Sequence, residues 1–153
     1  MSKSKIIFVN LPVTDIKRAT AFYEAIGAVK NEQFCDDTAS CMVFSETIHV
    51  MLLTHDKYKV FCAKKIADTK TTSEMIICMS AESRDDVDAT LDKAWNAGGK
   101  VDLMAKQDYG FMYFRNFEDR DGHIWEVMWM DEVAAQAAMA KGEDCPVGQA
   151  IAV

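Results

Sequence analysis

Residues 116–131 read NFEDRDGHIWEVMWMD, and one charged residue interrupts the apolar run at its end. The run IWEVMWM is typical of a buried strand, yet it carries Glu126 at its centre. A buried, unpaired carboxylate costs on the order of several kcal/mol. Glu126 is therefore predicted to pair with a buried cation, to face a cleft or to bind a metal ion.

The same order of strand and helix signals occurs twice along the chain. The first copy has a strand-like run at 5–13, a helical pattern at 14–27 and strand-like runs at 28–36, 39–46 and 47–55. The second copy has a run at 74–82, a helical pattern at 83–99 and runs at 100–106, 110–118 and 123–131. Thr14 or Asp15 caps the first helix and Ser83 the second, while Gly27 and Gly98 end them.

This repeat predicts an α+β fold built from two βαβββ modules. The expected modules span residues 5–62 and 73–131, with a connector at 63–72 and a C-terminal helix and tail at 132–153. A βαβββ unit has a half-open sheet that must cover one face, so two such units are expected to enclose a cleft. That cleft forms either within one chain or between two swapped chains of a homodimer.

Composition and charge exclude several classes of protein. The chain has 153 residues, is 50% hydrophobic and carries a formal charge of −7. It therefore has ample material for a core, and its acidity disfavours binding to a nucleic-acid backbone. The lysines between Lys57 and Lys70 are interpreted as a solvated connector.

Cysteine usage predicts a reducing, cytoplasmic location. The number of cysteines is odd and no two form a CxxC pair; they are Cys35, Cys41, Cys62, Cys78 and Cys145. No signal peptide precedes the first strand-like run. No apolar stretch approaches the roughly 20 residues of a membrane span.

Two stretches carry a resemblance to a known family. LPVTDIKRATAFYEAIG (11–27) resembles the first strand-to-helix signature of the vicinal oxygen chelate superfamily. That superfamily includes glyoxalase I, bleomycin-resistance proteins, fosfomycin-resistance enzymes and extradiol dioxygenases. FEDRDGHIWEV (117–127) resembles its closing signature, an F-x-D-P-D-G-type turn before a strand with a metal-ligating glutamate. Arg120 stands where proline is usual, and the resemblance covers about residues 5–131.

The resemblance implies a U-shaped cleft with metal ligands on the first and last strand of each module. Glu126 matches the terminal carboxylate ligand, but the corresponding positions in the first module fall on Phe8 and Met51. The remaining position lies within EMIICM (74–79), where one face offers only Met75, Ile77 or Met79 and the other only Glu74. A phenyl ring donates nothing to a metal, and a thioether is a soft ligand.

Neighbouring residues offer other donors. Asn10 shares a face with Phe8 and His49 shares a face with Met51, so Asn10, His49 and Glu126 form a conceivable ligand set. His55 could reach inward from a loop, whereas His123 is interpreted as a turn or surface residue.

Glu126 has two further interpretations. It could be a partly exposed strand residue that forms an ion pair with Arg115 on the neighbouring strand or with a lysine. It could also act in the cleft as a general base or as a hydrogen-bond acceptor for a ligand. The aromatic residues of the last two strands either fill the core or line the cleft; they are Phe111, Tyr113, Trp125 and Trp129.

The favoured function is metal-free binding of a small apolar or planar molecule, as in bleomycin-resistance proteins. The predicted cleft residues are Phe8, Asn10, His49, Met51, Phe111, Tyr113 and Arg115. The alternative is a lyase or isomerase similar to glyoxalase I, with Glu126 as catalytic residue and ligand of Ni, Zn, Fe or Mn. An extradiol dioxygenase ranks third, because the matched positions lack histidines.

Overall fold

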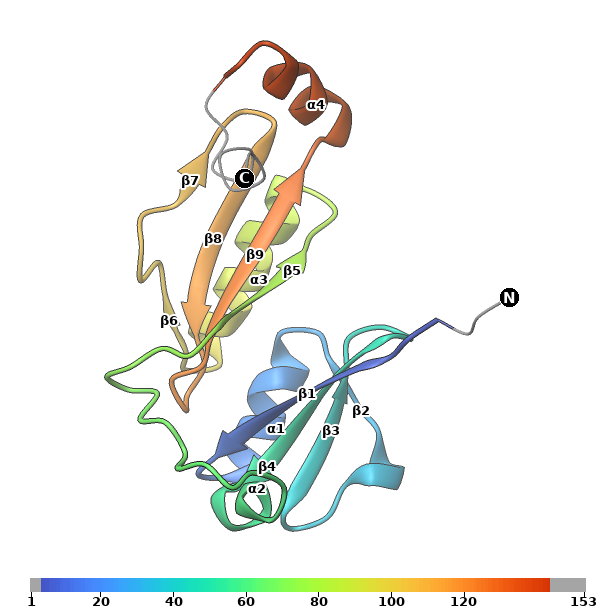
Figure 1. Cartoon of the computed structure of the whole chain (residues 1–153), viewed down its shortest axis with the longest axis vertical. Coiled ribbons are helices and arrows are strands. Elements are labelled where there is room, and N and C mark those ends of the chain that lie inside the picture. The colour runs from blue at the N-terminus through green and yellow to red at the C-terminus, as the bar shows by residue number, and fades with distance from the viewer. Residues whose placement is uncertain (1–3, 144–153) are drawn as a thin grey trace.

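The computed structural model describes residues 4–143 and contains two sheets, each covered by a helix on one side (Figure 1). The first module consists of β1 (Ile7–Val13), α1 (Ile16–Ala25), β2 (Val29–Lys30), the 3-10 turn η1 (Glu32–Phe34), β3 (Ala39–Val43), β4 (Ile48–Thr54) and α2 (His55–Phe61). The second consists of β5 (Ile76–Ser80), α3 (Arg84–Asn96), β6 (Lys100–Val101), β7 (Gln107–Asp108), β8 (Met112–Glu118), β9 (Ile124–Met130) and α4 (Glu132–Ala140). The predicted tail at 144–153 lies outside the described residues.

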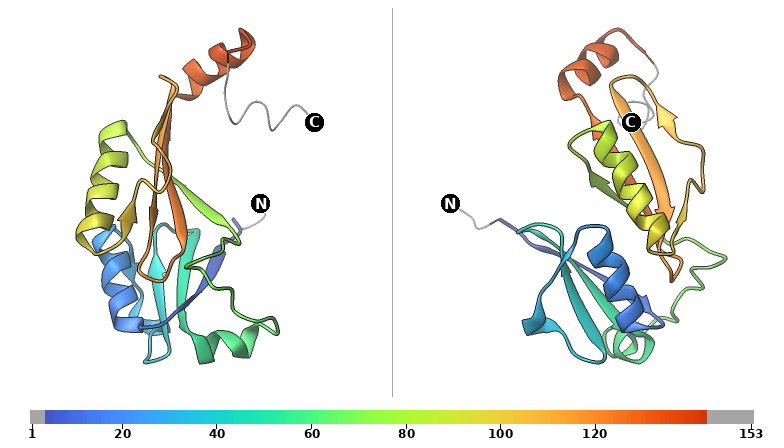
Figure 2. Two further views of the ribbon diagram at one scale, coloured as in Figure 1. Left: turned by 90° about the vertical axis from the view of Figure 1, so that its left-hand side faces the viewer. Right: turned by 180° about the vertical axis from the view of Figure 1, so that it is seen from behind.

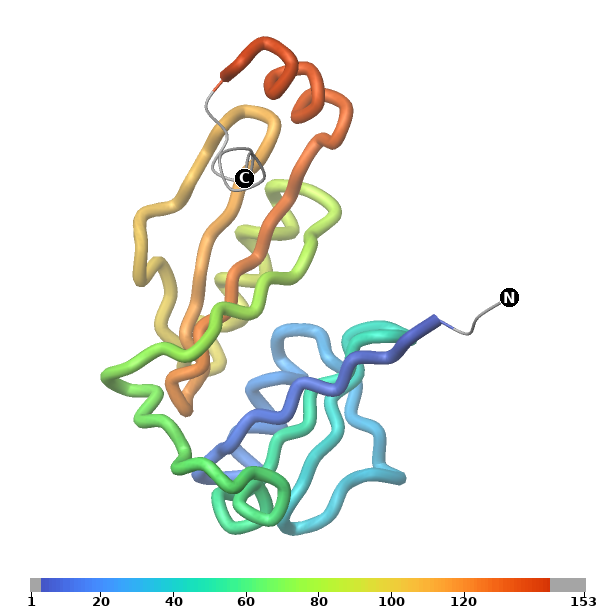
Figure 3. Tube along the Cα trace, in the orientation of Figure 1, coloured from blue at the N-terminus to red at the C-terminus, as the bar shows by residue number. Residues whose placement is uncertain are grey.

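Both sheets have the same topology, which confirms the predicted pair of modules. The strand order is β1-β4-β3-β2 in the first sheet and β5-β9-β8-β6 in the second, where β7 also pairs with β8. In each module the first strand runs parallel to the last, and the remaining pairings are antiparallel. Residues 62–75 contain no helix or strand and run from α2 to β5, as the chain trace in Figure 3 shows.

Capping residues set the bounds of the two covering helices as predicted. The Asp15 side chain accepts a hydrogen bond from the backbone N–H of Arg18, and Ser83 accepts one from Asp86, both at 3.0 Å. Gly27 and Gly98 follow the helix ends with φ of 109° and 90°, a conformation that glycine adopts without strain.

Three segments differ from the sequence prediction. The expected strand at 100–106 is confined to Lys100–Val101, where the next residue, Asp102, has a φ of 53° that lies outside the β region, and the short strand β7 was not predicted. The expected strand at 28–36 is confined to Val29–Lys30, because the Asn31 side chain caps the turn η1 and redirects the chain. Helix α2 was not predicted; it begins where the Thr54 hydroxyl accepts a hydrogen bond from the N–H of Lys57 at 3.3 Å. This helix lies at the end of the first sheet and contacts β1 and β4.

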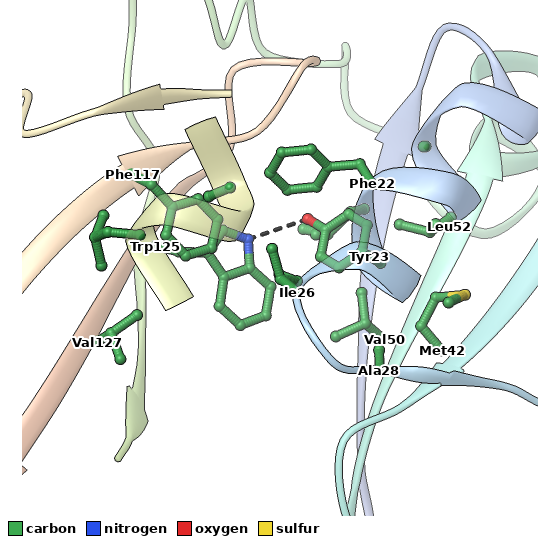
Figure 4. Packing of buried hydrophobic residues seen from close by; sticks show 14 of the residues in the cluster. Phe22, Tyr23, Ile26, Ala28, Met42, Val50, Leu52, Phe117, Trp125 and Val127 are labelled. Atoms are coloured by element: carbon green, nitrogen blue, oxygen red, sulfur yellow. Dashed lines mark hydrogen bonds between the residues drawn. The ribbon is translucent and has the colours of Figure 1, made fainter. Parts of the chain in front are cut away.

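One hydrophobic cluster joins the modules. Phe22 and Tyr23 of α1 meet Phe117 and Trp125 of the second sheet, and the Phe117 and Trp125 rings stack with centroids 6.1 Å apart (Figure 4). The indole N–H of Trp125 donates to the Tyr23 hydroxyl at 3.0 Å. Trp125 therefore belongs to the core rather than to a cleft.

The turn between β8 and β9 fastens the second module to the first. Asp119 accepts hydrogen bonds from its own turn, at the N–H groups of Asp121 and His123, and from the Tyr23 hydroxyl at 2.7 Å. Asp121 accepts from the backbone and the hydroxyl of Thr14 at 2.8 and 2.7 Å. Asp119 and Asp121 of the FEDRDGH segment thus have structural partners at the module junction.

The helices and the sheets form separate layers. Figure 2 (left) shows α1 and α3 on one side of the two sheets, so the other face of each sheet points away from the helices in the same general direction.

No helix among the described residues is long and apolar enough to cross a membrane.

Candidate functional site

The helix-free face of the first sheet presents four of the predicted cleft residues. In β1 and β4, Val9, Leu11, Val50 and Leu52 pack toward α1, so the alternating residues Phe8, Asn10, His49 and Met51 point to the opposite face. Phe8 lies beside His49 in the parallel ladder, with ring centroids 4.8 Å apart, and Asn10 lies beside Met51. Phe8 is 53% exposed, so this face is open to solvent.

The helix-free face of the second sheet carries Glu126. Glu126 lies between Cys78 on β5 and Asn116 on β8, which are its partners in the two adjoining ladders. Glu126 is only partly buried, so an apolar strand accommodates its carboxylate without a buried cation. The charged residue in the apolar run is explained by strand alternation: its neighbours Trp125 and Val127 face the core.

Cys78 was not recognised in the sequence as a neighbour of Glu126. Partial desolvation, followed by the nearby Glu126 carboxylate, raises the pKa of the Cys78 thiol to about 11. The thiol is therefore protonated near neutral pH and is a weak nucleophile and metal ligand. The sequence did contain a signal for it: residues 74, 76 and 78 alternate along the strand, so Cys78 shares a face with Glu74.

The predicted pairing of Glu126 with Arg115 is wrong. Arg115 lies opposite Val127, one position away from the Glu126 level, and so points to the helix side of the sheet. There its guanidinium donates to Asp102 at 2.9 and 2.7 Å and to Asp88 at 2.8 Å.

Tyr113 lies on the same helix side as Arg115. Its hydroxyl donates to Asp88 at 2.8 Å, and the Arg84 guanidinium lies 5.1 Å from its ring centre. Neither Tyr113 nor Arg115 shares a face with Glu126, because each is an odd number of positions from Asn116 along β8. Phe111 lies in the loop before β8, with its ring 6.5 Å from that of Tyr109.

The remaining histidines occupy different places. His123 is buried at the module junction, where its Nε2 lies 2.8 Å from the Pro12 carbonyl oxygen. His55 begins α2. Neither histidine is therefore a ladder neighbour of Glu126, whose neighbours are Cys78 and Asn116.

The described residues do not fit a metal site contained in one chain. Among residues 4–143, no three His, Cys, Asp or Glu side chains are grouped closely enough to hold a metal ion. The ladder neighbours of Glu126 are a protonated thiol and an amide, and Phe8 and Met51 offer an aromatic ring and a thioether.

A hollow of about 260 Å³ lies where the two modules meet the connector. It is lined by residues of β1, α2, β5, β9 and the segment between α2 and β5, among them Asn10, Tyr58, Glu74, Ile77 and Ile124. Asn10 links this hollow to the open face of the first sheet, because its side chain belongs to both.

A protein-family model matches most of the chain. Residues 5–127 match the Glyoxalase/Bleomycin resistance protein/Dioxygenase superfamily. The chain belongs to this superfamily. Its match covers both modules, as the duplicated topology requires, and confirms the resemblance seen in residues 11–27 and 117–127. No curated protein sequence matches the chain.

Several solved structures share the fold. A hypothetical protein, SA1046, from S. aureus is 21% identical with a TM-score of 0.70, and the alignment covers 84% of this chain and 95% of that one. A superfamily enzyme from Burkholderia phytofirmans PsJN is 14% identical with a TM-score of 0.70, covering 84% and 100%. A glyoxalase-related enzyme from Fulvimarina pelagi is 16% identical with a TM-score of 0.69, covering 83% and 88%.

Proposed function

We propose that the protein binds a small, apolar or planar molecule on the open face of the first sheet without using a metal ion. The main supporting observation is the group Phe8, His49 and Met51, which presents two tilted rings in contact and a thioether. Phe8 and Met51 stand where the resemblance implied metal ligands. Such polarizable groups favour flat apolar molecules, and each Å² of apolar surface that a ligand covers contributes about 25 cal/mol.

Two copies of the chain are proposed to enclose the ligand. Both helix-free faces of one chain point to the same side, so they do not form opposing walls of a cleft. Exposed apolar side chains lie near the start of the first strand on each of these faces, namely Phe8 and Ile76. A second copy that sets its second-module face against the first-module face would cover them and would bring Glu126 opposite His49.

The cytoplasmic location stays a prediction, supported by the state of the cysteines. The four cysteines in the described part of the chain are free thiols, and Cys145 lies outside it. Free thiols are typical of proteins in reducing compartments.

The test uses Nile red as a neutral planar probe. We expect saturable binding to the wild type, with the affinity falling at least fivefold in the double variant Phe8→Ala/Met51→Ala. The matched control is Phe61→Ala/Met104→Ala, which removes the same side-chain types from positions that are 71% and 70% exposed on other surfaces. This control is expected to bind as the wild type does.

Equal losses in both double variants would refute binding at the first-module face. A monomer at micromolar concentration in light scattering would refute enclosure by a second copy. Stoichiometric metal in protein purified without chelator, lost in Glu126→Ala, would replace the proposal with the lyase alternative.

A further inference from the structure

A second, positively charged groove lies away from the sheet faces. It is a hollow of about 1090 Å³ bounded by α1, α2, the connector and the turn between β8 and β9. Six cationic side chains line it: Arg18, Lys59, Lys64, Lys65, Lys70 and Arg120. His55 lies in the same lining. None of the residues Phe8, His49, Met51 and Glu126 contributes to it, so this groove is distinct from the open face of the first sheet, although Lys64 and Lys65 also line the smaller hollow at the connector.

The charge of the groove is opposite to that of the rest of the protein. Only two of the lining residues carry carboxylates, Asp68 and Asp121, which gives the lining a net charge of +4. Outside the lining, Asp56 lies 3.5 Å from the Lys59 ammonium group. The whole chain carries −7, so the remainder carries −11. Both carboxylates have partners, since Asp121 accepts from Thr14 and Arg18 and Asp68 accepts from Lys70 N–H and the Thr71 hydroxyl.

Within the described part of the chain, the cations of the connector and the turn have no acidic partner. Among residues 4–143, the ion pairs recorded include none for Lys64, Lys65, Lys70 or Arg120. Like charges gathered in a concave surface repel one another and concentrate the positive potential there. An anion in the groove would relieve this repulsion and would gain from every cation around it.

Arg120 gives the groove its wall on the side of the second module. It occupies the position where the closing signature of the resemblance has proline, and it places a guanidinium at the junction. Its side chain lies over the end of α3, since a Cβ on Gly98 would be 3.4 Å from the Arg120 Nε. This departure from the signature thus adds a cation to a groove that already holds lysines from the connector.

We infer that this groove binds the phosphate group of a small phosphorylated molecule. Several lysines and arginines around one hollow suit a group with multiple charges and several acceptor oxygens better than a single carboxylate. A small molecule is favoured over a nucleic acid, because the strongly negative surface outside the groove repels an extended phosphate backbone.

The experiment measures pyrophosphate binding by calorimetry at constant ionic strength. The groove variant is Lys64→Gln/Lys65→Gln/Arg120→Gln, and the matched control is Lys5→Gln/Lys93→Gln/Lys141→Gln, which removes the same charge from residues outside the groove. All six side chains are exposed, so both variants are expected to fold as the wild type does. We expect the groove variant to bind pyrophosphate at least tenfold more weakly and the control to stay within twofold of the wild type.

Three outcomes would overturn the inference. The first is no binding of pyrophosphate at millimolar concentration, and the second is equal weakening in the groove and control variants. The third is tighter binding of DNA: a 20-base-pair duplex would displace pyrophosphate at a concentration below the dissociation constant of pyrophosphate. That result would make the groove a nucleic-acid surface. Nile red binding should be unaffected by the groove variant, so this test and that of the apolar site fail independently.

Discussion

The substitution Tyr23→Phe removes one oxygen atom from the junction between the modules. The Tyr23 side chain is fully buried, and its hydroxyl donates to Asp119 at 2.7 Å and accepts from Trp125 Nε1 at 3.0 Å. Burial, followed by the negative charge of Asp119, raises the pKa of Tyr23 well above its usual value, so the hydroxyl remains protonated and keeps donating.

The expected loss of stability follows from the two groups left behind. The Trp125 N–H loses its recorded partner in the buried junction, whereas Asp119 keeps two backbone donors. A buried polar group without a partner costs about 1–3 kcal/mol, so the variant should lose roughly 2–4 kcal/mol of unfolding free energy. In a chain of this size that loss lowers Tm by roughly 5–15 °C.

Urea denaturation followed by circular dichroism measures this loss, with Tyr113→Phe as the control. The Tyr113 hydroxyl also donates to a carboxylate, but Asp88 is 48% exposed and also binds Arg115, so water and Arg115 can replace the lost bond. We expect the control to lose less than about 1 kcal/mol. Equal losses in the two variants, or a loss below about 1 kcal/mol for Tyr23→Phe, would refute the role assigned to the junction.

Two further predictions concern charge. The paired hydrogen bonds from Arg115 lower the pKa of Asp102, so this carboxylate contributes stability above its unfolded pKa of about 3.9 and loses it as pH falls through the lower folded value. Asp102→Asn keeps a residue type that tolerates the φ of 53° at this position. It should lower the unfolding free energy by about 0.5–1 kcal/mol at pH 7, after allowance for solvent screening. In thermal melts the difference from the wild type should vanish near pH 2, and a difference that persists there would contradict the ion-pair explanation. Glu126→Gln removes a negative charge beside Cys78 and should lower the pKa of its thiol. Alkylation of Cys78 by iodoacetamide at pH 8, followed by mass spectrometry, should then be several-fold faster than in the wild type. An unchanged rate would show that the carboxylate does not act on the thiol.

The architecture was predictable because its signals are local and occur twice. Asp15 and Ser83 cap the helices and Gly27 and Gly98 end them, as the sequence indicated. The strand expected at 28–36 failed because the side chain of Asn31 offers the backbone a turn in place of a ladder. Strand propensity alone does not include that competition.

The candidate site was predictable only where strand alternation could be counted within one strand. Phe8 and Asn10, like His49 and Met51, share a face as expected. The pairing of Arg115 with Glu126 depended on the register between two strands, and a difference of one residue moved Arg115 to the other face. The basic groove depends on how the connector lies against the junction, which no local pattern in the sequence specifies.

The junction between the modules limits how this protein can hold a ligand. Many binding proteins close two lobes around their ligand by bending at a hinge of a few residues. Here such bending would separate Phe22 from Phe117 and break the bonds of Asp119 and Trp125 to Tyr23. A single chain is therefore expected to present its two sheet faces at a fixed angle, and ligand capture would proceed on a preorganised surface with little ordering entropy to lose.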